Sequence, residues 1–357
     1  MSERVNVCVI VGNGFDLAAG LGTFTQAFVR GFAAVHHGKD TPTSRIAERI
    51  LIDGPENWAD FEKKLGEYAY VVDMMGIVED PVSEYVDAKA AIESELNAFI
   101  AEKESYVDND LVEQAAGECL SSLCGWLDEL APRERISVLG DFSAPLTFDF
   151  HFVTLNYTQV LDTMIELQRS SSASAYTSES VSGYYLHECV HAHGDLAGNS
   201  ICGVDSPSQI CSEALSHSDE VLETVVKGQS QVLLGSLDDE RAFSFIKSAE
   251  VILIYGCSLG ETDARWWKAV VNWLNASSSK RFIVLFSYGF RRNGRPVAAV
   301  RKDITALKER LFSSAGLSDH EFKKALFNRI FILPSESVFK MPGTLISEES
   351  YYERNYL

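Results

Sequence analysis

Three polar side chains that follow apolar segments have the chemistry of a catalytic site. Asp16 ends the sequence GNGFD, Asn156 lies in TLNYT, and His193 lies in HAHGD. A histidine exchanges protons near neutral pH, and a carboxylate can stabilise positive charge. An asparagine offers both a donor and an acceptor, so it can orient a ligand or a water molecule. We therefore predict Asp16, Asn156 and His193 as catalytic residues.

Glycines after the first apolar segment predict a nucleotide-binding turn. They allow a sharp turn and a close approach of the backbone to a phosphate. The pattern departs from the usual dinucleotide fingerprint, because Leu17 stands where the third glycine would fall. A plain strand-to-helix turn, with Asp16 capping the helix, is the structural alternative. The residues predicted to bind a nucleotide here are Gly12, Asn13, Gly14 and Phe15.

A second turn of small residues, in the sequence IYGCSLGETD at 254–263, follows another apolar segment. Such a turn supplies free backbone N–H groups, and Ser258 adds a hydroxyl. Asp263 would lie in the first turn of the next helix, where the helix dipole favours it whatever its function. Asn156 could likewise be a helix N-cap rather than a ligand. The remaining predicted nucleotide-binding residues are Thr154, Tyr157, Gly256, Ser258, Leu259 and Asp263.

The histidines leave a second chemistry open. In a strand, His191 and His193 would face the same side because side chains alternate. The spacing of His187, His191, His193 and Asp195 also permits metal binding, which would suit a metal-dependent hydrolase or nuclease. A nucleotide-sensing interaction module without chemistry is a third hypothesis. A hydrogen-bonded structural role is the alternative for each histidine. Our predicted site contains no metal.

Strands that alternate with helices predict an α/β fold with a Rossmann-like, mostly parallel sheet. Short apolar segments at 5–11, 150–155, 184–186, 189–192, 200–203, 251–255, 282–286 and 330–333 are the expected strands. A long helical stretch separates the first two, and it includes helices at 80–104 and at 108–130, the latter ended by Pro132. We predict a core of residues 1–30 and 149–357 and a helical insertion subdomain at 31–148. The polar turns should meet at the carboxyl edge of the sheet.

Composition restricts the partners and the compartment. Lys and Arg number 31 and Asp and Glu 51, which gives a formal net charge of −20. So acidic a surface repels a phosphate backbone and disfavours nucleic acid. Seven cysteines without a C-x-x-C pattern fit a reducing cytoplasm. No apolar run is long enough for a bilayer, so we predict a cytoplasmic protein without a membrane partner.

In this order the motifs resemble those of the bacteriophage abortive-infection AbiH family. The resemblance rests on VGNGFDLAAGLGTFTQAF at 11–28, WADFE at 58–62, FVTLNYTQVLD at 152–162, HAHGD at 191–195 and YGCSLGETDARWW at 255–267. That family is in turn similar to sirtuin-like NAD-binding domains. The similarity implies that Asn156 orients the ribose or the attacking water and that His193 is the base. Thr158 replaces the usual aspartate, and the paired zinc cysteines of sirtuins are missing, so protein deacylation is not implied.

The resemblance implies a phage-defence enzyme that binds NAD, as substrate or ligand, and hydrolyses the nicotinamide–ribose bond. Cleavage of this bond passes through a cationic ribosyl transition state, which Asp16 could stabilise. Depletion of NAD would arrest the infected cell. The expected partners are a small-molecule nucleotide and either a second copy of the chain or a phage-derived trigger.

Overall fold

Six parallel strands form the sheet at the centre of the computed structural model, which describes residues 2–58, 60–74, 79–143, 145–170, 177–276 and 280–347. The strand order is β3-β2-β1-β4-β5-β6. It confirms the predicted α/β class, and it is the doubly wound order in which the chain switches direction between β1 and β4. The strands are β1 (Glu3–Val11), β2 (Leu146–Thr154), β3 (Val181–His191), β4 (Val251–Tyr255), β5 (Phe282–Ser287) and β6 (Ile330–Pro334).

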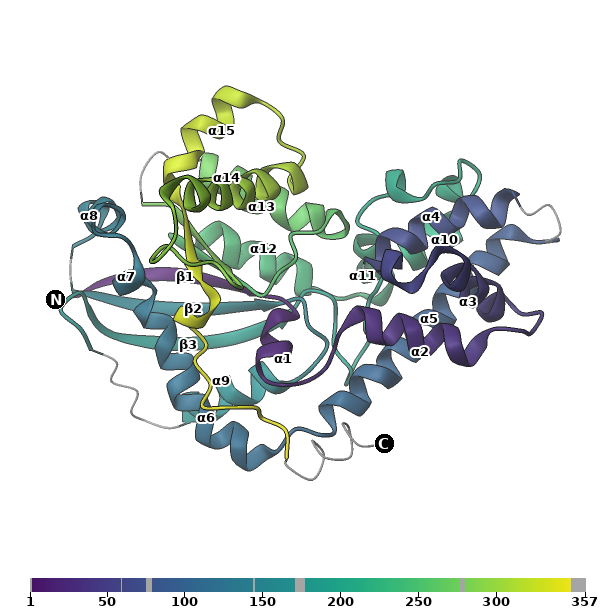
Figure 1. Ribbon diagram of the computed structural model, residues 1–357, viewed down its shortest axis with the longest axis horizontal. Coiled ribbons are helices and arrows are strands. Elements are labelled where there is room, and N and C mark those ends of the chain that lie inside the picture. Colours follow the sequence, from purple (N-terminus) through teal and green to yellow (C-terminus); the bar gives the residue numbers. More distant parts are fainter. Residues whose placement is uncertain are drawn as a thin grey trace.

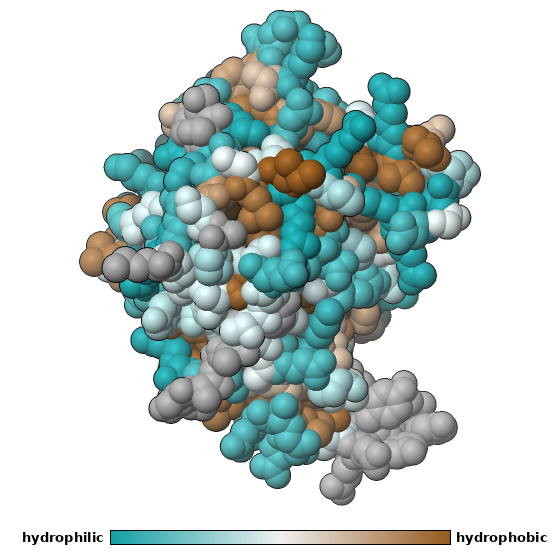
Figure 2. Space-filling view, turned by 90° about the vertical axis from the view of Figure 1, so that its left-hand side faces the viewer, coloured by the Kyte–Doolittle hydropathy of each residue, from teal (hydrophilic) through white to brown (hydrophobic). Residues whose placement is uncertain are grey.

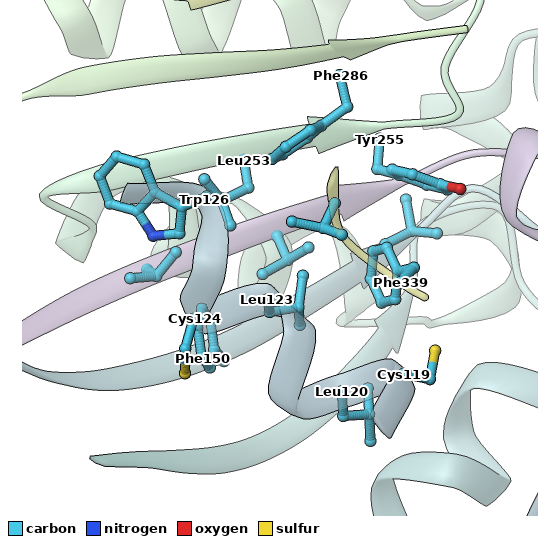
Figure 3. Packing of buried hydrophobic residues seen from close by; sticks show 14 of the residues in the cluster. Cys119, Leu120, Leu123, Cys124, Trp126, Phe150, Leu253, Tyr255, Phe286 and Phe339 are labelled. Atoms are coloured by element: carbon cyan, nitrogen blue, oxygen red, sulfur yellow. The ribbon is translucent and has the colours of Figure 1, made fainter. Parts of the chain in front are cut away.

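Apolar side chains on both faces of the strands explain the parallel sheet, because helices must cover each face. One face packs against α6 (Asn109–Ser121), α7 (Trp126–Glu129), α8 (Pro132–Asp141) and α9 (Val160–Ser170). Figure 3 shows Leu120, Leu123 and Trp126 of this layer beside strand residues Phe150 and Leu253. The short α1 (Gly14–Ala18) follows β1 on the same side, and its Phe15 joins this core.

The other face of the sheet has its own hydrophobic core. It packs against α12 (Asp238–Ser248), α13 (Ala264–Asn275), α14 (Val297–Ser314) and α15 (His320–Leu326). Trp266 and Trp267 are both buried in this core. Figure 1 shows these helices above the strands and α6 and α9 below them, so the sheet is enclosed as its composition requires.

A third core belongs to a group of helices beside the carboxyl ends of the strands (Figure 1). It is formed by α2 (Thr25–His36), α3 (Pro42–Asp53), α4 (Phe61–Met74) and α5 (Pro81–Glu104), together with residues of 202–226 that include α10 (Asp219–Val225). We call this group the helical unit. The described residues between β1 and β2 are mostly helical, and their helices join two cores: α3 to α5 join the helical unit, and α6 to α8 cover the sheet.

Several predicted boundaries are wrong. The helical stretch predicted to stop before Pro132 does end at Glu129, but Pro132 also begins a further helix, α8, that was not predicted, because proline is tolerated where the N–H has no helical partner. The helix predicted at 108–130 is interrupted at Ser122–Gly125. The segments at 184–186 and 189–192 are one strand, β3, and residues 200–203 form no strand. Of the serine-rich stretch at 170–182, residues 171–176 lie outside the described residues.

The surface carries no sign of a membrane span. Among the described residues, no helix is both long enough and apolar enough to cross a bilayer. Figure 2 shows the face at the amino ends of the strands, where hydrophilic side chains dominate and apolar ones form small separate patches. The larger hollow of the molecule lies at the opposite, carboxyl edge of the sheet.

Candidate functional site

A cleft of about 1400 Å³ opens where the carboxyl ends of the strands face the helical unit. The helical unit contributes Phe28, Phe61 and Phe99 to its wall. The cleft lies over the switch between β1 and β4, where open α/β sheets bind ligands. The predicted site residues that line it are Gly12, Asn13, Gly14, Asp16, Asn156, Tyr157, His193, Gly256, Ser258, Leu259 and Asp263.

Two other predicted residues do not line the cleft. Phe15 is fully buried and packs edge-on against Phe339, with the ring centres 5.1 Å apart. Thr154 is also buried, and its Oγ1 accepts a hydrogen bond of 3.1 Å from the backbone N–H of Asn156. Both residues therefore support neighbours that do line the cleft. A direct contact of either with a nucleotide stays a prediction.

Asp16 and Asn156 form a buried hydrogen-bonded pair. Asn156 Nδ2 donates to Asp16 Oδ1 over 3.1 Å, and Thr158 Oγ1 lies 3.0 and 2.9 Å from the two carboxylate oxygens. Burial raises the pKa of Asp16 to about 7, against the opposing effect of these two donors; nearby Glu104 adds to the rise. Thr158, which departs from the sirtuin pattern, thus donates to a carboxylate supplied by α1.

The structure gives Asp16 and Asn156 no capping role. Asp16 lies inside α1, and α9 begins at Val160, four residues beyond Asn156. Asn156 is 5% exposed, and its Oδ1 has no hydrogen-bond partner among the described residues. A buried acceptor without a partner is unfavourable by about 1–3 kcal/mol. A ligand or water that donates to this oxygen would remove the cost.

His193 lies in the turn after β3 and is also buried. Its Nε2 lies 3.0 Å from Asp263 Oδ1, near enough for an ion pair but without hydrogen-bonding geometry. Burial lowers the pKa of His193, and the charge of Lys227 lowers it further, which outweighs the effect of Asp263 and Glu62. The imidazole is therefore neutral at pH 7 and can accept a proton.

The predicted metal ligands do not converge. His187 Nε2 lies 3.1 Å from Asp149, and the ring nitrogens of His191 lie 2.9 Å from Asp162 and 2.9 Å from the carbonyl oxygen of Asn156. His193 faces away from both, into the cleft. In the described part of the chain, the potential ligands that lie together are Asp162, Cys189 and His191. Both ring nitrogens of His191 already have a partner in the protein, Asn156 O and Asp162 Oδ2.

The glycines after β1 serve the packing of two loops. Gly12 N–H donates to Tyr255 O and Gly14 N–H to Gly256 O, each over 2.9 Å. A Cβ on Gly14 would lie 2.4 Å from the Cα of Gly256, so no larger residue fits. These two N–H groups are therefore bonded within the protein, and a contact of Gly12 or Gly14 with a nucleotide stays a prediction. The glycines let the loops after β1 and β4 touch at the bottom of the cleft.

The loop after β4 does have free N–H groups. None of the described residues accepts a hydrogen bond from the backbone N–H of residues 257–260. Leu259 has a φ of 55°, which belongs to the left-handed region that helps to form anion-binding concavities. The loop also reads G-x-S-x-G, a serine nucleophile pattern. However, Ser258 is exposed and has no hydrogen bond to a histidine, so the geometry does not support a serine hydrolase.

Two charged residues of the site, Lys227 and Glu62, were not predicted from the sequence. Lys227 is 1% exposed, and its Nζ lies 2.8 Å from Glu62 Oε2, 2.9 Å from Asp263 Oδ1 and 3.1 Å from Thr262 O. Glu62 is the last residue of the WADFE motif, so its place in that motif could have identified it as a site residue. Lys227 belongs to none of the sequence motifs. Only the fold places its ammonium group against Glu62 and Asp263, which line the cleft.

The strand order and the position of the cleft define a doubly wound α/β protein with a cleft where such sheets bind ligands. A family model described as bacteriophage abortive infection AbiH matches residues 8–285. The chain therefore belongs to the AbiH family, as its motifs predicted, and membership indicates a role in abortive infection. A search among curated proteins finds no match.

Proposed function

We propose that this abortive infection protein binds NAD or a related nucleotide in the cleft and hydrolyses its nicotinamide–ribose bond. The observation that carries the proposal is the convergence of buried Asp16, Asn156 and His193 on one cleft, with Asn156 Oδ1 left without a partner. A ribose hydroxyl or a water molecule is a donor of the kind that this oxygen needs.

The three side chains have complementary parts in such a reaction. The C1′–N bond breaks, nicotinamide leaves with the electron pair, and the ribosyl group becomes cationic. The Asp16 carboxylate stabilises this cation in a cleft with little solvent. Asn156 orients the water that forms the new bond to C1′, and His193 accepts the proton that the water loses. The products are nicotinamide, ADP-ribose and one proton.

The charges along the cleft suit the two ends of a dinucleotide. The reactive residues follow β1, β2 and β3, whereas the free N–H groups of 257–260 follow β4. Arg310 and Lys340, which have no ion-pair partner among the described residues, line the cleft from α14 and from the chain after β6. Six strands about 4.8 Å apart span about 24 Å. Phosphates bound at the β4 side of the cleft would place the nicotinamide ribose near Asp16, on the side of β1, β2 and β3.

Incubation of the purified protein with NAD tests the proposal. Chromatography should show nicotinamide and ADP-ribose in equal amounts. Binding of NAD without turnover would favour a nucleotide-sensing module instead, and neither binding nor turnover would contradict the proposal. In the cell, NAD loss would arrest infection; a second copy of the chain or a phage-derived trigger stays a predicted partner.

A further inference from the structure

Lys227 is a buried ammonium group that the proposed reaction does not use directly. It begins α11 (Lys227–Leu234), and its backbone N–H donates to Val204 O over 3.0 Å. Its Nζ has three acceptors, Glu62, Asp263 and Thr262 O, at 2.8, 2.9 and 3.1 Å. An ammonium has three N–H donors, so this one is fully satisfied by the protein. A lysine so held is a fixed charge and not a flexible surface residue.

The partners of Lys227 come from two different parts of the fold. Glu62 belongs to α4 of the helical unit, and its Oε1 also accepts from Gly203 N–H over 3.1 Å. Asp263 lies between β4 and α13, on the sheet side of the cleft. Lys227 therefore joins the two walls of the cleft by one buried charge.

The same oxygen of Asp263 faces both Lys227 and His193. Asp263 Oδ1 lies 2.9 Å from Lys227 Nζ and 3.0 Å from His193 Nε2. The charged groups around His193 are Asp263 from the β4 side, Glu62 from α4 and Lys227 from α11; the neutral ring of Tyr157 has its centre 6.5 Å away. Without the lysine, two carboxylates would face the imidazole and no cation would balance them.

We propose that Lys227 is a positioning residue of this site, which fixes Asp263 against His193 and ties the helical unit to the sheet through Glu62. The proposal rests on the proposed function, because it assigns Lys227 the task of keeping His193 an uncharged base. Burial lowers the pKa of Lys227, but Asp263 and Glu62 outweigh burial and hold this pKa above its usual range. The residue is thus an ammonium and no nucleophile.

Histidine NMR gives a test that does not depend on catalysis. The chain has eight histidines, and the variant His193→Gln identifies the signal of His193. In Lys227→Met, the pKa of His193 should rise by about one unit or more, because the carboxylates then stabilise the imidazolium. Lys227→Arg should keep the wild-type titration. Lys308→Met is the matched control: Lys308 is also buried, but its Nζ binds Phe327 O outside the site.

If Lys227→Met does not fold, Glu62→Gln is a second variant that tests the same charge coupling to His193. This change removes one carboxylate and leaves the ammonium, so the pKa of His193 should move down instead of up. An unchanged His193 titration in either folded variant would overturn the proposal. The two variants could shift the pKa of His193 in opposite directions, as expected, while the wild type releases no nicotinamide from NAD. That result would contradict the proposed function and leave the coupling of Lys227 to His193 in place.

Discussion

At the residue scale, Asp16 shows how burial creates a reactive group at a cost in stability. Its carboxyl group is 2% exposed, and its pKa is raised to about 7 by burial. The folded protein keeps this proton at pH values where the unfolded chain, with an ordinary value of 3.8, has lost it. The contribution of Asp16 to stability is therefore greatest at low pH and falls as the pH rises towards 7.

The variant Asp16→Asn should be more stable than the wild type at pH 8 and a much slower enzyme. The gain in unfolding free energy should be on the order of 2 kcal/mol at pH 8 and close to zero at pH 4. NAD hydrolysis should drop by about 10²–10³, because a neutral amide cannot stabilise a ribosyl cation. Denaturant unfolding at the two pH values, with a nicotinamide assay, measures both effects. A loss of stability that is equal at pH 4 and pH 8 would argue against the raised pKa.

The same ionisation predicts a pH dependence of activity. Because Asp16 must be a carboxylate to stabilise the cation, kcat/KM should rise through about pH 7, with the pKa of Asp16. The pKa of His193 is lowered, so this base is already neutral at pH 7, where Asp16 titrates. Initial rates between pH 5.5 and 8.5 would show the profile. Activity that is highest at pH 5.5 would rule out an ionised Asp16 in the reaction.

At the scale of elements, the loops after β1 and β4 depend on glycines where their backbones touch. Gly14→Ala places a methyl group 2.4 Å from the Cα of Gly256, and the backbone must shift to admit it. We expect a loss of about 1–3 kcal/mol of stability together with weaker NAD binding. Gly31→Ala is the matched control: Gly31 lies in α2, and a Cβ there would have no atom within 4 Å beyond its own helix backbone and chain neighbours, so this change should stabilise the helix by about 1 kcal/mol. Equal effects of the two changes in thermal melts would refute the packing role.

The elements also show what sequence patterns can and cannot predict. Residues 251–255 are a run of apolar and aromatic side chains, and this run is the strand β4. The α/β class and the meeting of the polar turns at one edge followed from such runs. The role of the glycines did not, because the contact of Gly14 with Gly256 joins residues more than 240 positions apart. The helix α8 was not predicted because Pro132 was interpreted only as a helix stop, whereas proline is also favoured in the first turn of a helix.

At the scale of the whole molecule, an acidic protein has a cleft with cations at one end. Reversal of Arg310 and Lys340 to glutamate should weaken NAD binding about tenfold at low salt and less at high salt, because exposed charges are screened. Arg301→Glu is the control, since Arg301 lies on the same helix α14 but does not line the cleft. Calorimetric titration at two salt concentrations measures the effect. Equal weakening by the control would show that net charge, and not the cleft, is responsible.

Contacts that form only in the whole folded molecule could not be predicted from the sequence. Family membership, and the meeting of most of the predicted site residues at one cleft, followed from ordered motifs. Lys227 was not predicted, because a lysine in sequence is normally a surface residue. Its burial depends on Glu62 and Asp263, which come from the helical unit and from the sheet side of the cleft and meet only in the folded protein.

The most direct test of the account compares nicotinamide release by the wild type, Asn156→Ala and His193→Ala, with a thermal melt of each protein. We expect the wild type to hydrolyse NAD. Each variant should fold and lose about 10²–10⁴ in rate, since one removes the group that orients the water and the other removes the base. Wild-type activity retained by a well-folded His193→Ala or Asn156→Ala protein, or a wild type that releases no nicotinamide, would contradict the account.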